Sequence, residues 1–142
     1  MPVNYRADRT IACTIAVWDG DLTGEDMQQQ LIRLANDPDW PPGPRHLLDL
    51  STLGTVIIPD PELLELLYEG TNLVQQMRIA IVVRPDFLDD ETRTRFDIAR
   101  DAFDAATFTG LDSACAYLGV TASTVRATIE KLRRELSRSA PT

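Results

Sequence analysis

The chain has 142 residues, and its 22 acidic and 14 basic side chains give a net charge of −8. This acidic balance argues against a protein that coats nucleic acid or an anionic membrane with its whole surface. No apolar run reaches the roughly 18–20 residues of a membrane span, and residues 1–9 lack a signal-peptide core, so we expect one cytoplasmic globular domain with no membrane partner.

Apolar residues at alternating and helical spacings predict ten elements. In chain order they are strands at 3–6 and 10–18, a helix between Thr23 and Asp37, a strand at 46–50, a leucine-rich helix from Asp60, a strand at 78–83, a helix at 90–105, a strand at 106–109, and helices at 112–118 and 123–138. Thr23 followed by Asp26 is a capping-box variant, and Asp37, which precedes a proline, ends the first helix. Asp60 and Pro61 are typical of a helix cap and first turn.

This order of elements is typical of an α/β fold. We expect an N-terminal β-hairpin, then alternating strands and helices that form a mostly parallel sheet of four or five strands flanked by helices. The strand at 78–83 is apolar on both faces, which suits a strand covered on both sides. We expect residues 1–119 to form the α/β domain, which ends at Gly119, and residues 120–142 to add a C-terminal amphipathic helix and a short tail.

Several segments resemble a known family. They are the strand 46–53 with the sequence HLLDLSTL, the strand 78–83, the helix exit 37–40 and the closing helix 113–119. Together with a hairpin in residues 1–20, they resemble the STAS-type, SpoIIAA-like domains of the anti-sigma factor antagonist type, most nearly an uncharacterised bacterial branch. The resemblance covers about residues 1–119. It implies a small α/β domain that binds proteins, nucleotides or lipids and has no catalysis of its own.

The sequence departs from that family at one position. In the anti-sigma factor antagonists, the strand end that resembles residues 49–53 leads to a helix start whose serine is phosphorylated by a partner kinase. Here residues 57–63 read IIPDPEL, so no Ser or Thr stands beside Asp60, and both Asp60 and Glu62 place negative charge at that helix start. We therefore expect no phosphorylation switch there.

The sequence carries no pattern for catalysis, a cofactor or a metal. The single histidine, His46, is three positions from Asp49, and side chains three apart on a strand face opposite sides. Cys13 and Cys115 have neither a CxxC partner nor a neighbouring His. Nucleophile elbows and glycine-rich phosphate loops are missing from the sequence. We expect a non-enzymatic protein without cofactor or metal.

The C-terminal helix carries a narrow apolar seam with spacings of four, three and four residues. Its members are Val125, Ile129, Leu132 and Leu136. Residues 120–142 also hold five basic and two acidic side chains, a net of +3 within an acidic chain. The seam predicts packing on the chain's own sheet or on a neighbouring subunit, and a homodimer is one form of the latter. We expect a protein partner or a second copy.

An alternative is DNA binding. Residues 111–130 fit a helix-turn-helix with its turn at Gly119, and Thr124, Arg126, Arg133 and Arg134 would then contact phosphates or bases. The acidic body of the chain opposes this interpretation.

A second alternative is a carrier of a small ligand or lipid. Its apolar pocket would lie between the second helix and the sheet, lined by Leu63, Leu67 and Ile81. The interpretation that the sequence favours is a binding or regulatory module that acts through protein–protein interaction.

Overall fold

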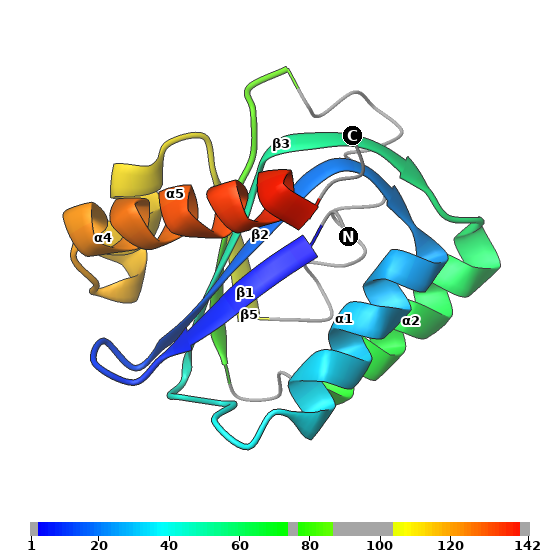
Figure 1. Ribbon diagram of the computed structural model, residues 1–142, viewed down its shortest axis with the longest axis horizontal. Coiled ribbons are helices and arrows are strands. Elements are labelled where there is room, and N and C mark those ends of the chain that lie inside the picture. Colours follow the sequence, from blue (N-terminus) through cyan, green and yellow to red (C-terminus); the bar gives the residue numbers. More distant parts are fainter. Residues whose placement is uncertain (1–2, 74–76, 87–103, 140–142) are drawn as a thin grey trace.

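The computed structural model describes residues 3–73, 77–86 and 104–139, which form a sheet with helices on both faces (Figure 1). The strands are β1 (Val3–Asp8), β2 (Cys13–Thr23), β3 (Arg45–Ile57), β4 (Arg78–Val82) and β5 (Asp104–Phe108). The helices are α1 (Gly24–Asn36), α2 (Asp60–Leu73), α4 (Leu111–Leu118) and α5 (Ala122–Ser139). The helix expected at 90–105 lies almost entirely outside the described residues.

The strands lie in the order β1-β2-β3-β4-β5 in a five-stranded sheet of the described residues. β1 and β2 are antiparallel, which confirms the N-terminal hairpin, and the other three pairs are parallel. The mixed α/β fold expected from the sequence is therefore confirmed. A sheet with this much parallel pairing must be covered on both faces, because its interior strands are apolar on both.

Two apolar cores fill the two faces of the sheet. Side chains of successive strand residues point to opposite faces, so β2 sends Ile15 and Val17 to the face beneath α4 and α5, where Leu47 of β3 joins them. On the other face, Leu50 and Ile81 pack beneath α1 and α2. Figure 1 shows the two helix pairs on opposite sides of the sheet.

Local signals in the sequence set the ends of the helices. The Thr23 hydroxyl accepts the backbone N–H of Asp26, and the Asp26 carboxylate accepts that of Thr23, so α1 begins at the expected capping box. Asp37 caps the other end of α1. Gly119 ends α4 in the left-handed region at φ 74°, where a residue without a Cβ is favoured.

Strands β2 and β3 both run further than their local sequence predicts, to Thr23 and Ile57, respectively. They pair along their length with two register shifts, and the added part holds residues of low strand propensity such as Gly54. Asp21 supports this part, since its carboxylate accepts the backbone N–H of Thr55 at 2.9 Å. Pairing between strands distant in sequence thus overrides the local preference.

None of the helices in the described parts of the chain is long and apolar enough to cross a membrane.

The packing of α5 predicts a stability effect. Ile129 is 3% exposed in the core beneath α5, so Ile129→Ala leaves a cavity and should lower the free energy of unfolding by about 2–5 kcal/mol. Urea unfolding followed by circular dichroism measures this loss. The control is Thr124→Ala on the exposed side of α5, which should change stability by less than about 0.5 kcal/mol. Equal losses in both variants would contradict the placement of α5.

Candidate interaction surface

The apolar seam expected on the C-terminal helix packs on the chain's own sheet. Val125, Ile129 and Leu132 are buried among side chains of β2, β3 and β4, and Leu136 is partly buried beside them. Asn4 of β1 donates a hydrogen bond to the backbone carbonyl of Leu132, which fixes α5 along the edge of the sheet. The three buried members of the seam are therefore covered within one chain.

A polar cluster joins α5 to the middle of β3. Arg133 Nη2 lies 2.7 Å from Asp49 Oδ2 and 2.9 Å from Ser51 Oγ. Asp49 is 4% exposed. Its other carboxylate oxygen, Oδ1, accepts the backbone N–H of Ser51 at 2.9 Å. Arg133, considered above as a nucleic-acid contact, therefore acts inside the fold and compensates a buried carboxylate.

The other three residues considered for nucleic-acid contact lie on the outer side of α5. Arg126 pairs with Asp112 of α4 at 3.2 Å, and both side chains are largely exposed. Thr124 and Arg134 are exposed. The structure therefore does not bring these four residues together into one basic surface.

Two of the residues considered for a ligand pocket belong to the core beneath α1 and α2. Ile81 is 8% exposed, and Leu63 is partly buried against the same cluster. The side chain of Leu67 lies outside the described residues.

His46 is buried in β3 between Thr14 of β2 and Ile79 of β4, its neighbours across the sheet. Burial lowers the pKa of its imidazole from 6.5 to about 4, because the charged ring would lose its hydration. Within the described residues, its Nδ1 has no hydrogen-bond partner. The lowered pKa means that the ring is neutral at pH 7.

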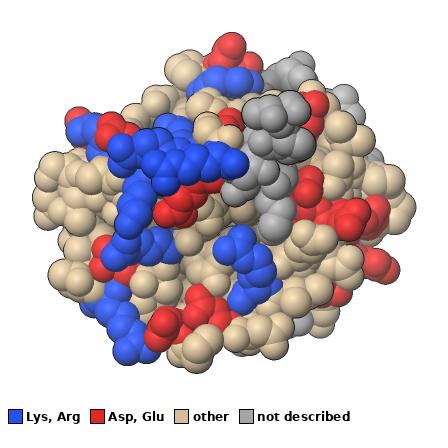
Figure 2. Space-filling view, viewed as in Figure 1, with Lys and Arg blue, Asp and Glu red and all other residues tan. Residues whose placement is uncertain are grey.

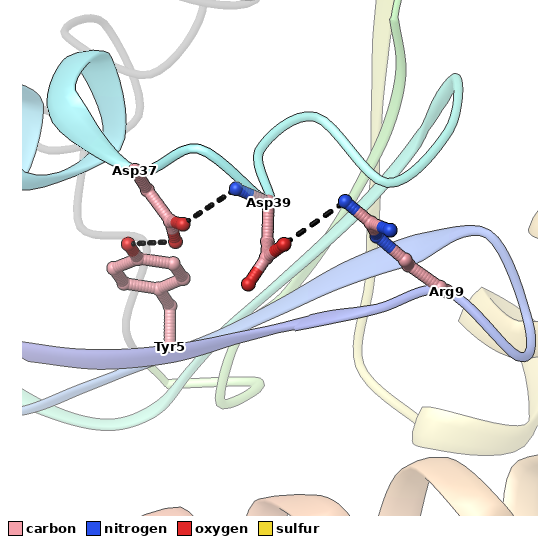
Figure 3. Close-up of polar contacts among 4 residues, drawn as sticks. All are labelled: Tyr5, Arg9, Asp37 and Asp39. Atoms are coloured by element: carbon pink, nitrogen blue, oxygen red, sulfur yellow. Dashed lines mark hydrogen bonds and ion pairs between the residues drawn. The ribbon is translucent and has the colours of Figure 1, made fainter.

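A second polar group fixes the segment that follows α1, as Figure 3 shows. The Tyr5 hydroxyl donates to Asp37 at 2.6 Å, and burial together with this carboxylate raises the pKa of Tyr5 to about 12. Asp37 also accepts the backbone N–H of Asp39, and Arg9 pairs with Asp39 at 2.9 Å. These contacts link the β1–β2 hairpin to the exit of α1, so we interpret them as structural.

The start of α2 lies against the start of α1. The carboxylate of Glu62 lies against Gly24, in the space that a Cβ would occupy at that position. The backbone N–H of Leu63 bonds to the carbonyl of Pro59 in the first turn of α2. This is where a phosphate acceptor would stand in the resembling family, and here the two first turns carry acidic side chains.

Large apolar side chains are exposed around α2. Leu64 is 54% exposed and Tyr68 is 70% exposed, and their spacing of four residues places them side by side on the helix. Ile57, at the end of β3 just before α2, is 56% exposed. We call these three residues the α2 apolar patch. The leucine-rich pattern of α2 did not distinguish them from core residues, although a helical wheel separates Leu64 from the buried Leu66.

An acidic row runs beside this patch. Glu62, Glu65 and Glu69 are exposed and recur at spacings of three and four, so they lie on one side of α2. Figure 2 shows acidic side chains gathered at the end of the molecule where α1 and α2 begin, and basic side chains gathered along α5. In the described parts of the chain, no group of three or more His, Cys, Asp or Glu is placed to hold a metal ion.

Known proteins define the class of fold. No protein-family model matches the chain, and no curated protein matches it. The solved structures that match the chain in fold include the following two. An uncharacterised protein of the DUF3478 family with a SpoIIAA-like fold, from Shewanella loihica PV-4, has a TM-score of 0.56 at 18% identity and covers 82% of this chain and 93% of that one.

The anti-sigma factor antagonist SpoIIAA in its unphosphorylated form has a TM-score of 0.54 at 9% identity, covering 80% of this chain and 94% of that one. The chain is therefore an α/β domain of the SpoIIAA-like fold. The resemblance to STAS-type domains is confirmed as a resemblance of fold.

The buried histidine predicts a pH dependence of stability. Because the folded pKa of about 4 lies below the ordinary 6.5, the unfolded chain binds a proton more readily, and His46 destabilises the fold as pH falls from 6.5 towards 4. When the pH falls from 7 to 5, the free energy of unfolding of the parent should decrease by about 2 kcal/mol more than that of His46→Leu. Urea unfolding at the two pH values measures this difference. Equal acid losses in parent and variant would contradict it.

Removing each of the two arginine ion pairs of α5 should lower the free energy of unfolding by a different amount. Arg133→Gln leaves the carboxylate of Asp49 buried without its cation and should lower the free energy of unfolding by about 3 kcal/mol. Arg126→Gln removes a pair between exposed side chains and should cost less than about 1 kcal/mol. Urea unfolding of both variants tests this ranking, and a larger loss in Arg126→Gln would reverse it.

Proposed function

We propose that this chain is a non-enzymatic, cytoplasmic regulatory module that binds a protein partner through the outward side of α2. The fold supports a regulatory role, because it is shared with an anti-sigma factor antagonist, a protein that acts on another protein.

The observation that carries the proposal is the α2 apolar patch. Single exposed apolar side chains are ordinary on protein surfaces. Here Leu64 and Tyr68 are adjacent on one helix, and both are more than half exposed. Aromatic side chains such as Tyr68 are enriched in protein interfaces, where they combine apolar area with a polar hydroxyl.

Charge adds to the specificity of this surface. Glu65 lies one turn before Tyr68, beside the patch, and Glu62 and Glu69 continue the acidic row along α2, so the partner we propose carries apolar side chains and basic residues. Asp60 and Glu62 supply negative charge at the start of α2 without any modification. We therefore propose binding that does not depend on phosphorylation at this helix start.

The two alternatives lack a comparable observation. Arg133, considered as a DNA contact, bonds to Asp49, and Leu63 and Ile81, considered as pocket residues, pack in the core. No arrangement of the described residues favours either function over protein binding.

A matched pair of variants tests the proposal. Leu64→Asp places a charge in the centre of the patch, and Ile32→Asp places one at an equally exposed apolar position, 54%, on the neighbouring helix α1. The tagged parent and both variants are used to capture partners from the source cells, with quantitative mass spectrometry as the readout. Circular dichroism and urea unfolding confirm that the variants fold alike.

We expect the partner to be recovered with the parent and with Ile32→Asp, and its recovery to fall at least about tenfold with Leu64→Asp, since an unpaired charge opposes burial of the patch. Equal recovery with Leu64→Asp would contradict the proposed surface. A photo-crosslinker in place of Tyr68 then identifies the contacting segment.

A further inference from the structure

A basic row runs along the outer side of α5. Lys131, Arg134 and Arg138 are exposed and recur at spacings of three and four, so they lie on one side of the helix. The buried seam lies on the opposite side, because Arg134 is nine positions from Val125, half a turn away on the helical wheel. The row therefore points away from the sheet.

The fold itself makes no use of this row. Arg126 and Arg133 pair with Asp112 and Asp49, respectively, whereas the three residues of the row make no ion pair within the described parts of the chain. The row is also unusual in its setting, because residues 120–142 have a net charge of +3 in a chain whose total is −8.

The acidic row on α2 matches the basic row in length. Glu62, Glu65 and Glu69 have the same two spacings as Lys131, Arg134 and Arg138, and each row spans eight residues, about 10 Å of helix from first to last. Whether the two helices run parallel or antiparallel, the central charges of the rows come within about one residue of each other, which long side chains can bridge.

These rows cannot meet in one molecule. α5 covers one face of the sheet and α2 the other, as Figure 1 shows. The exposed side chains of the two rows can therefore meet only in a contact between copies. The apolar patch adds area to such a contact, because aliphatic stems of Lys and Arg can pack on Leu64 and a guanidinium can stack on the ring of Tyr68.

We propose that the α2 surface of one copy binds the α5 basic row of a second copy. The proposal rests on the proposed function in taking the same α2 surface as a protein-binding site, and it adds a second copy of the chain as a ligand of that site. Because the two surfaces differ, the contact is heterologous, and association continues beyond the dimer unless it closes into a ring.

Such a contact is small and strongly charged, so it is weak and sensitive to salt. At about 0.02 M salt the charges act across the interface, and at about 0.3 M they are screened within a few ångströms. Monomer mass is 15.8 kDa, so each added copy is readily detected by light scattering or sedimentation velocity.

Two charge reversals at the centres of the rows give the decisive experiment. Glu65→Arg disables the α2 surface and leaves α5 intact, whereas Arg134→Glu does the reverse. A mixture of the two variants restores one native contact, between α5 of the first and α2 of the second. Glu25→Arg on α1 is the control for Glu65→Arg, because it makes the same change in net charge at an exposed site outside the rows.

We expect the average mass of the full chain and of Glu25→Arg to rise above 15.8 kDa with concentration at low salt and to return to it at high salt. Each reversal alone should weaken association about tenfold or more, and the mixture should recover it.

Two results would overturn the inference. One is a mass of 15.8 kDa at every concentration and salt level, and the other is association that survives both reversals. Neither result affects the partner capture by which Leu64→Asp tests the proposed function, so the two proposals can fail separately.

Discussion

The need to cover both faces of a largely parallel sheet shapes the rest of this molecule. β2, β3 and β4 carry apolar side chains on both faces, so one pair of helices cannot bury them all. α4 and α5 supply the second cover. This requirement turns the seam of Val125, Ile129 and Leu132 inwards, and it places the opposite side of α5, with its basic row, in solvent. The position of the charges thus follows from the packing of the core.

The same requirement separates two kinds of arginine on α5. Arg133 lies at the margin of the seam, where its guanidinium reaches a carboxylate on β3 that would otherwise be buried alone. Arg126 and Arg134 lie further round the helix, in contact with water. A count of basic residues does not distinguish the three arginines. In the fold, Arg133 stabilises the structure, whereas Arg126 and Arg134 lie on the surface.

Local signals predicted those parts of the fold that local contacts decide. Thr23 caps α1 and Gly119 ends α4 because each acts within a few residues of itself. The full lengths of β2 and β3 were not predicted, since pairing along Gly54 depends on a strand more than thirty residues away. The sequence also did not decide which surface the seam packs against, because an apolar stripe has the same spacing whether its partner is a sheet or another helix. The candidate surface was missed for a related reason: leucine content alone does not say that Leu64 faces solvent.

The start of α2 carries different chemistry in two groups of proteins that share a fold. In the resembling family a phosphorylated serine adds negative charge there, whereas here the sequence itself supplies the carboxylate of Glu62, which lies against Gly24 of α1. Under the proposed function, a carboxylate that is built into the sequence is not added or removed by a kinase, so competition or concentration would control the binding of a partner at this surface. A second copy of the chain would be such a competitor, because the contact between copies would cover the α2 surface that another protein would need. Binding of an outside partner would then depend on how much of the chain is present, and the basic row of α5 would set that threshold.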